Sequence, residues 1–255
     1  MANGKSQMKN TVLFDLGGTL VQYFGRSEVR EVLGQAIAEV QECLGQRGLL
    51  HVAAEEVWER AADEGREASD YRVRPLEQRL ARIFRLDEHT CSDALLEALC
   101  RCFVRPIFKR ARRYDDTLPV LQQLRSEGRR IAIVSNTAWG SPGELWREEI
   151  VRHGLDGLVD TVVFCRDVGW RKPAPQIFAY TLEKVGVGPE DCIFVGDDPR
   201  WDFCGPRAVG IAAVLLDRSG TLQDVTEDRV RDLYAFYDSL RAGASSLSLS
   251  GRGPG

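Results

Sequence analysis

Paired cysteines and clustered histidines are both lacking in this sequence. Its three histidines, His51, His89 and His153, lie far apart along the chain. The seven cysteines are scattered and odd in number, and the nearest pair, Cys100 and Cys102, does not have the spacing of a zinc site. We therefore expect neither zinc nor a disulfide framework, and we expect a cytoplasmic location, where thiols stay reduced.

Long apolar runs and an excess of basic charge are also lacking. No run approaches the roughly 20 residues of a membrane-spanning helix. Residues 1–10 are polar and do not contain the apolar stretch of a signal peptide. The formal net charge is -4 and the pI is about 5.6, which does not favour nucleic acid or an anionic membrane surface as a partner. We expect a soluble protein that binds neither.

Five short apolar runs are the clearest signal that the sequence does contain. Most are rich in Val and Ile, and their apolar residues are continuous rather than alternating, which is typical of strands buried on both faces of a parallel sheet. Helical patterns separate the last four runs, so the sequence predicts an α/β fold with a Rossmann-like, doubly wound parallel sheet. The runs lie at 11–14, 131–134, 161–164, 192–195 and 211–216.

The stretch between the first two runs is far too long for a single crossover helix. Apolar residues recur there at helical spacing, as Leu33, Ile37, Val40 and Leu44 do, with polar residues between them. We therefore predict an all-helical insert rather than a connecting loop. Its expected helices lie at 28–44, 53–68, 76–84 and 92–108.

This pattern divides the chain into three predicted parts. Residues 9–20 and 112–240 form the α/β core, which resumes after the insert with a helix at 114–124 that Gly128 ends. Residues 21–111 form the insert, a helical cap. Residues 241–255 are rich in Ser and Gly and are expected to be disordered.

Polar residues follow the predicted strands where each strand ends. Because ligands of open parallel sheets bind beyond the carboxyl ends of the strands, these residues are expected to meet at one rim. The rim would combine carboxylates, hydroxyls and a lysine. In chain order its residues are Asp15, Gly17, Gly18 and Thr19, then Ser135 and Asn136, then Lys172, and finally Asp197, Asp198 and Asp202.

These residues resemble the four motifs of the haloacid dehalogenase-like hydrolase superfamily, in the same order. The resemblance covers nearly the whole chain except its two ends, and the predicted insert matches the helical cap that this superfamily carries between its first and second motifs. Four motifs in order are a far more specific signal than any one of them. The resemblance implies a hydrolase, in most members a phosphatase of small phosphorylated substrates.

The resemblance also implies roles for individual residues. Asp15 would be the nucleophile that forms a covalent intermediate. Ser135 and the neighbouring Asn136 would hold the phosphate, and Ser135 is equally suited to cap a helix. Lys172 would offset the negative charge of the aspartate and the phosphate. Thr19 would support Asp15 or the phosphate, or simply pack in the turn.

A cation is implied by the same motifs, because clustered carboxylates repel one another in a partly dry site. Mg²⁺, a hard cation with oxygen ligands, suits a site that also holds phosphate oxygens. By resemblance, Asp15, the main-chain carbonyl of Gly17 and Asp197 would bind it. Asp198 would join them or lie behind them. Asp202 is expected to support Lys172 or a helix N-terminus rather than to bind the metal. The alternative for both is that they are ordinary solvated loop acids.

Gly17 departs from the phosphatase pattern, because most of these phosphatases carry there a second aspartate that protonates the leaving group. Three explanations remain open. The first is a Mg²⁺-dependent phosphatase that needs little protonation or that uses Asp198 or a cap residue. The second is a metal-independent 2-haloacid dehalogenase, whose halide leaves without a proton. The third is a weakly catalytic binding or regulatory protein. The retained acidic cluster favours the first.

Overall fold

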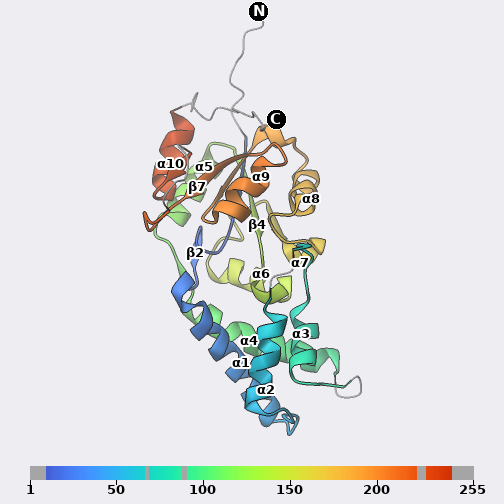
Figure 1. Ribbon diagram of the computed structural model, residues 1–255. Coiled ribbons are helices and arrows are strands. Elements are labelled where there is room, and N and C mark those ends of the chain that lie inside the picture. The colour runs from blue at the N-terminus through green and yellow to red at the C-terminus, as the bar shows by residue number, and fades with distance from the viewer. Residues whose placement is uncertain (1–9, 67–68, 88–90, 223–227, 243–255) are drawn as a thin grey trace, which may run out of the picture.

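A six-stranded parallel sheet forms the centre of the computed structural model, which describes residues 10–66, 69–87, 91–222 and 228–242. The strand order is β5-β4-β1-β6-β7-β8, and every neighbouring pair is parallel. This order is that of a Rossmann-like sheet, which confirms the predicted fold class (Figure 1). The strands are β1 (Thr11–Phe14), β4 (Arg130–Ser135), β5 (Thr161–Phe164), β6 (Cys192–Gly196), β7 (Ala212–Leu216) and β8 (Arg229–Val230).

All five predicted strands are present within about one residue of their expected bounds. These strands could be predicted from the sequence because they are continuously buried and therefore continuously apolar; β1 and β6 are buried at every position. The sixth strand, β8, was not predicted. It contains two residues, Arg229 and Val230, and pairs at the edge with β7. It is therefore too short to form an apolar run in the sequence.

Helices cover both faces of the sheet, as a doubly wound fold requires. Val12 and Phe14 of β1 point into the hydrophobic cluster that contains α5 (Thr117–Ser126) and α10 (Leu233–Arg241). Leu13 points into the opposite cluster, which contains α8 (Pro175–Val185). The two-residue alternation along β1 therefore supplies both cores. The remaining core helices are α6 (Gly143–Arg152), α7 (Cys165–Val168) and α9 (Gly205–Arg207).

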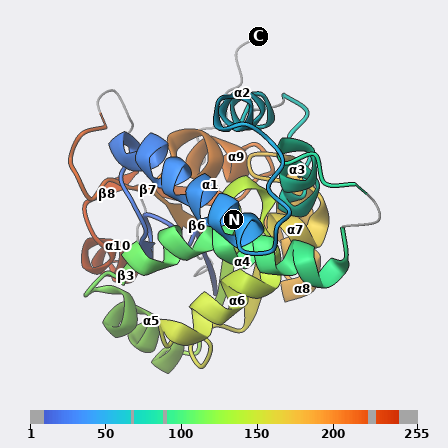
Figure 2. The same cartoon turned by 90° about the horizontal axis from the view of Figure 1, so that it is seen from below.

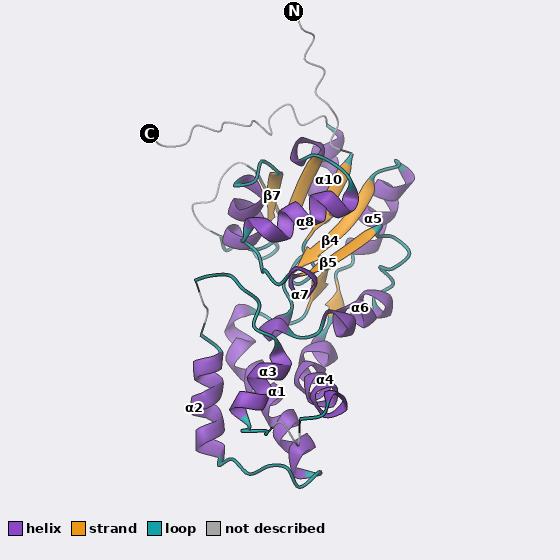
Figure 3. Cartoon of the chain, turned by 90° about the vertical axis from the view of Figure 1, so that its right-hand side faces the viewer, coloured by secondary structure: helices purple, strands orange, loops and turns teal. Residues whose placement is uncertain are grey.

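Four α-helices occupy the described part of the predicted insert, and they lie beyond the end of the sheet, apart from the core layers (Figures 1 and 3). Helix α1 packs along α4, and Figure 2, viewed from the cap end, shows the two side by side. The side chain of Ser92 caps α4 by accepting a hydrogen bond from Leu95 N. The helices are α1 (Val29–Gly45), α2 (Ala54–Glu64), α3 (Leu76–Ile83) and α4 (Asp93–Arg110).

A short antiparallel ribbon marks where the insert leaves and rejoins the core. Its strands, β2 (Val21–Gln22) and β3 (Arg112–Arg113), pair with each other, and neither was predicted because each has only two residues. Buried residues of the insert belong to the same hydrophobic cluster as Phe14 of the sheet. The helices of the insert are thus packed onto the end of the sheet that carries the polar rim.

Basic residues near the end of α4 lie on its outer face. Arg105 pairs with Glu39 of α1, and Arg110 pairs with Glu28 and Glu31. These partly exposed ion pairs place the basic residues on a solvated helix face. The predicted helix at 114–124 is observed as α5, and Gly128 follows it with φ +75°.

The predicted disordered tail falls largely at 243–255, outside the described residues. Its first residue, Arg241, is instead the last residue of α10. Within the described ranges, no helix combines the length and the apolar character needed to cross a membrane.

Candidate active site

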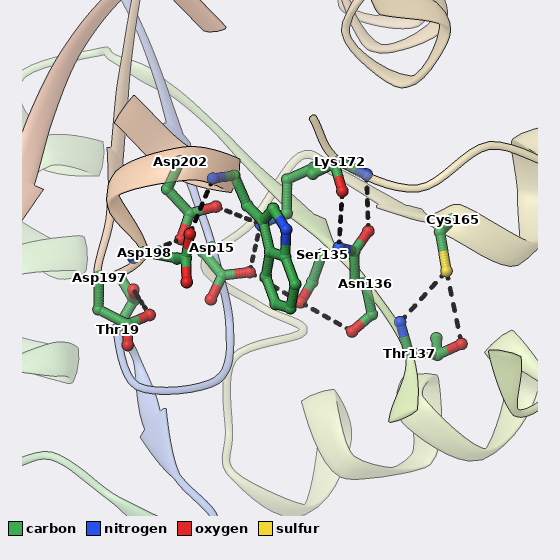
Figure 4. A network of polar contacts seen from close by, with 11 residues as sticks. Asp15, Thr19, Ser135, Asn136, Thr137, Cys165, Lys172, Asp197, Asp198 and Asp202 are labelled. Carbon is green, nitrogen blue, oxygen red and sulfur yellow. Dashed lines mark hydrogen bonds and ion pairs between the residues drawn. The ribbon is translucent and has the colours of Figure 1, made fainter. Parts of the chain in front are cut away.

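The polar rim lies at the carboxyl ends of the three central strands. Asp15 directly follows β1, Ser135 ends β4 and Asp197 directly follows β6. The chain runs from β1 outward through β4 and β5, then returns to the other side of β1 with β6. This is the switch point at which open α/β sheets bind ligands, and Figure 4 shows the predicted residues gathered there.

Asp15 is held by two side chains from different elements. The hydroxyl of Ser135 donates to Asp15 Oδ1 at 2.9 Å, and Lys172 Nζ donates to the same oxygen at 2.6 Å. Asp15 is only 6% exposed. Both contacts fix the orientation of the carboxylate while engaging a single oxygen, so the geometry is compatible with attack by the other oxygen, Oδ2.

Lys172 is buried between two carboxylates. Its ammonium lies 2.6 Å from Asp15 Oδ1 and 2.6 Å from Asp202 Oδ1, and the residue is 1% exposed. Burial by itself would lower the pKa of Lys172, but the charges of Asp15 and Asp202 outweigh it and raise the pKa above its ordinary value. The lysine therefore stays charged at neutral pH.

The side chain of Asn136 holds the main chain of Lys172. Asn136 Nδ2 donates to Lys172 O at 3.2 Å, and Asn136 Oδ1 accepts from Lys172 N at 2.8 Å (Figure 4). Both polar atoms of the amide are thereby engaged. The structure places Asn136 as a support for Lys172, and a phosphate contact from this residue would have to come from its main chain.

Three carboxylates converge beside the lysine. Asp15, Asp197 and Asp202 each contribute one carboxylate oxygen to a group in which all three oxygens lie within 4.8 Å of one another. Burial, followed by the charges of Asp15 and Asp202, raises the pKa of Asp197 to about 8. Such crowding of carboxylate oxygens fits a divalent hard cation, which would let Asp197 ionise.

Asp202 and Asp198 have partners within the protein. Asp202 Oδ2 accepts from Asp198 N at 3.1 Å, while Oδ1 contacts Lys172. Asp198 Oδ1 accepts from the main-chain N–H groups of Arg200 and Trp201, so it caps the helical turn η4 (Pro199–Cys204). The geometry agrees with Asp202 as the support of Lys172 and places Asp198 at a helix cap.

Thr19 and Gly18 contact Asp197 from the loop after β1. Thr19 is fully buried, and its hydroxyl lies 3.5 Å from Asp197 Oδ1. Gly18 has φ +82°, and a Cβ at this position would lie 2.4–2.7 Å from all three atoms of the Asp197 carboxyl group. Glycine is thus required both by the backbone conformation and by the close approach of the carboxylate.

The Gly18→Ala variant is therefore expected to lose about 2–5 kcal/mol of unfolding free energy, the sum of a left-handed alanine and an overpacked contact. The matched control is Gly128→Ala. Gly128 has φ +75° but nothing within 4 Å of the added Cβ, so only about 1–2 kcal/mol should be lost. Urea unfolding of both variants measures the difference, and equal losses would contradict the contact with Asp197.

Arg218 is a supporting residue that sequence reasoning missed. Its guanidinium forms two hydrogen bonds with Asp116, at 2.8 and 2.9 Å, and donates to Thr19 O at 2.8 Å. Asp116 also accepts from Leu233 N at the start of α10. The loop after β1 is thus tied to two distant helices. No local motif surrounds Arg218, so only the fold could reveal this contact.

The fold and the site together define a class of protein, a Rossmann-like hydrolase core with a helical insert and an aspartate–lysine centre at the switch point of its sheet. The chain belongs to the haloacid dehalogenase-like hydrolase family, whose model matches residues 9–210. This confirms the resemblance drawn from the four motifs.

Known relatives include both phosphatases and dehalogenases. The chain is 33% identical to phosphoserine phosphatase of Thermus thermophilus over 66% of its own length and 65% of that protein. It is 33% identical to glyceraldehyde 3-phosphate phosphatase of Methanopyrus kandleri over 44% of its length and 46% of that protein. These alignments span about half to two thirds of the relatives.

Solved structures match over more of the chain. The crystal structure of HAD phosphatase from Thermococcus onnurineus has a TM-score of 0.61 and 27% identity, covering 92% of this chain and 98% of that one. The 2-haloacid dehalogenase from Pseudomonas syringae has a TM-score of 0.67 and 20% identity, covering 94% and 100%. At that identity the second match shows the shared fold alone.

Proposed function

We propose that the protein is a Mg²⁺-dependent phosphatase that hydrolyses small phosphorylated metabolites through an aspartyl-phosphate intermediate. The observation that carries this proposal is the convergence of the carboxylates of Asp15, Asp197 and Asp202, two of which, Asp15 and Asp202, pair with the buried ammonium of Lys172. The names of the Thermus and Methanopyrus relatives, both phosphatases of small monoesters, support it. We also propose that the protein is cytoplasmic and that it consists of an α/β core and a helical cap.

The reaction begins when the Asp15 carboxylate attacks phosphorus. A bond forms between Asp15 Oδ2 and phosphorus while the bond to the leaving oxygen breaks, and that oxygen departs with the electron pair. Ser135 and Lys172 hold Asp15 Oδ1 and so keep the carboxylate oriented. Water then attacks phosphorus, inorganic phosphate leaves, and the Asp15 carboxylate is restored.

Lys172 provides the fixed positive charge of this scheme. It offsets the charge of Asp15 in the free enzyme and that of the phosphate oxygens as they approach. Asp15, the main-chain carbonyl of Gly17 and Asp197 would hold Mg²⁺, which supplies further neutralisation of the phosphate charge. The main-chain N–H of Asn136 would bind a further phosphate oxygen, since that of Thr137 donates to Cys165 Sγ. The hydroxyl of Thr19 contacts Asp197 and would support the phosphate from there.

A dehalogenase is the second candidate, and the absence of a side chain at Gly17 favours it because a halide needs no proton to leave. The carboxylate cluster argues against it. Displacement of a halide from carbon provides no reason to crowd Asp197 against Asp15, whereas a phosphatase needs a cation there. A weakly catalytic binding protein is the third candidate and would retain the fold without turnover.

A single assay separates these candidates. Phosphate release is measured from a panel of phosphorylated sugars, amino acids and small acids with Mg²⁺ present, and chloride release is measured from 2-chloro acids with chelator present. We expect phosphate release that stops when the metal is chelated. Chloride release in chelator would support the dehalogenase, and tight ligand binding without either product would support a binding protein.

The metal site is tested by the response of stability to Mg²⁺. Saturation at about 100 times Kd should stabilise the wild-type protein by about 2.7 kcal/mol. The Asp197→Asn variant should lose this response yet be more stable than wild type in chelator, because a carboxyl group crowded by Asp15 and Asp202 is replaced by a neutral amide.

Asp238→Asn, at an exposed position of α10, is the control for removing one negative charge. It should leave the response to Mg²⁺ intact. The melting temperatures of the wild type, Asp197→Asn and Asp238→Asn are measured with and without Mg²⁺. A full response to Mg²⁺ in Asp197→Asn would exclude Asp197 as a ligand.

A further inference from the structure

The space beside Gly17 is taken up by an aromatic ring. A Cβ built on Gly17 would lie 3.4 Å from Cδ2 and 3.7 Å from Cε2 of Tyr23. These are ordinary van der Waals distances. Tyr23 directly follows β2 at the start of the insert. The ring therefore lies against the position from which other phosphatases of this family project their proton-donating aspartate.

The hydroxyl of Tyr23 is buried and has no hydrogen-bond partner among the described residues. Tyr23 as a whole is 7% exposed. A buried hydroxyl left without a partner costs about 1–3 kcal/mol, and buried tyrosines normally find an acceptor. An unpartnered hydroxyl on a ring that borders Gly17 can therefore bond to a ligand in the site.

The ring is held rigidly by its neighbours. Tyr23 makes an edge contact with Trp146 of α6, with ring centroids 5.3 Å apart, and lies 6.4 Å from Phe108 of α4. Trp146 is itself fixed, because its indole N–H donates to Ser141 Oγ at 2.8 Å. A side chain locked in this way from both core and insert loses little entropy when it meets a substrate.

The electrostatic surroundings keep the phenol protonated. Burial, then the charge of Glu149, then that of Asp15, raises the pKa of Tyr23 above its ordinary value. The neutral phenol thus carries the proton that an alkoxide leaving group requires.

We propose that Tyr23 is the catalytic acid that protonates the leaving oxygen, in place of the aspartate missing at position 17. This rests on the proposed function. As the bond from Asp15 to phosphorus forms and the bond to the leaving oxygen breaks, the Tyr23 proton passes to that oxygen. The resulting phenolate takes a proton from the water that attacks phosphorus in the second step, which restores both Tyr23 and Asp15.

Asp198, the other residue considered for this task, is less suited to it. Its Oδ1 accepts two main-chain hydrogen bonds at the start of η4, each 2.9 Å long. Releasing the carboxyl group would uncap that turn. Tyr23 has no such bond to give up, and its ring rather than Asp198 borders Gly17.

The test compares two phosphate monoesters that differ in how much protonation their leaving groups need. The ratio kcat/KM is measured with Mg²⁺ for p-nitrophenyl phosphate, whose phenolate leaves readily, and for an alkyl phosphate such as glycerol phosphate. The Tyr23→Phe variant should lose about 10²-fold or more on the alkyl ester. It should lose little on the nitrophenyl ester, because that leaving group does not need the proton.

Tyr237→Phe is the matched control. Tyr237 lies on α10, away from the rim, and its hydroxyl donates to Glu127 at 2.6 Å. This variant should leave both kcat/KM values unchanged. Thermal unfolding adds a second readout. Removing an unpartnered hydroxyl should leave the melting temperature of Tyr23→Phe unchanged or raise it, whereas removing a structural hydroxyl would lower it.

Equal losses on both esters, no loss on either, or a Tyr23→Phe protein that fails to fold would each overturn the assignment of Tyr23 while leaving the phosphatase proposal in place. A wild-type protein that hydrolyses no phosphate monoester would overturn the proposed function itself. A selective loss on the alkyl ester with an intact fold supports both.

Discussion

The Asp15→Asn variant is expected to release phosphate about 10⁶-fold more slowly than wild type, or not measurably, which is the scale seen when a nucleophile is removed. An amide oxygen can still accept hydrogen bonds from Ser135 and Lys172, so the local geometry should survive. It is too weak a nucleophile to attack phosphorus. The measurement is kcat with Mg²⁺ on whichever ester the wild-type enzyme hydrolyses fastest.

Asp232→Asn is the control for an aspartate-to-asparagine change. Asp232 caps α10 by accepting from Ala235 N at 2.7 Å, and asparagine caps helices equally well. This variant should keep full activity. Turnover by folded Asp15→Asn within tenfold of wild type would mean that Asp15 only positions other groups.

The Lys172→Met variant is expected to lose about 3–5 kcal/mol of unfolding free energy in chelator, the cost of removing one partner from a buried ion pair. Methionine fills similar space but leaves Asp15 and Asp202 facing each other without the ammonium that now lies 2.6 Å from each. Activity should fall as well, by about 10²–10³-fold, as when one charge-stabilising donor is removed. Urea unfolding and kcat measure the two effects.

Lys184→Met is the control, because Lys184 lies exposed in the last turn of α8. Its stability should change by no more than about 0.5 kcal/mol. Adding Asp202→Asn to Lys172→Met should recover part of the lost stability, since one uncompensated carboxylate disappears. If the double variant is less stable than Lys172→Met, the repulsion between Asp15 and Asp202 is not the cause.

Much of the fold could be predicted because its signals are local. Continuous burial marked β1 and β6, and helical spacing marked the insert. The convergence of Asp15, Lys172 and Asp197 could also be predicted, although these residues are far apart in sequence. Carboxyl ends of parallel strands share one edge, so topology alone brings their following residues together.

The rest depended on contacts that no local pattern contains. The amide of Asn136 was expected at the phosphate, but both of its polar atoms bind the main chain of Lys172. The contact of Arg218 with Thr19 joins segments that are 199 residues apart. The approach of Tyr23 to Gly17 requires knowing how the ring packs on Trp146. Which groups these three side chains contact depends on the folded structure and not on the residues next to them in the sequence.

The most direct test of the account is to trap the covalent intermediate. Wild-type protein is mixed with a monoester carrying a radiolabelled phosphoryl group, quenched in acid during turnover and digested. We predict label on the peptide that contains Asp15, and none in the Asp15→Asn variant. Phosphate release at an undiminished rate with no labelled protein, or with label on a peptide that lacks Asp15, would contradict the account.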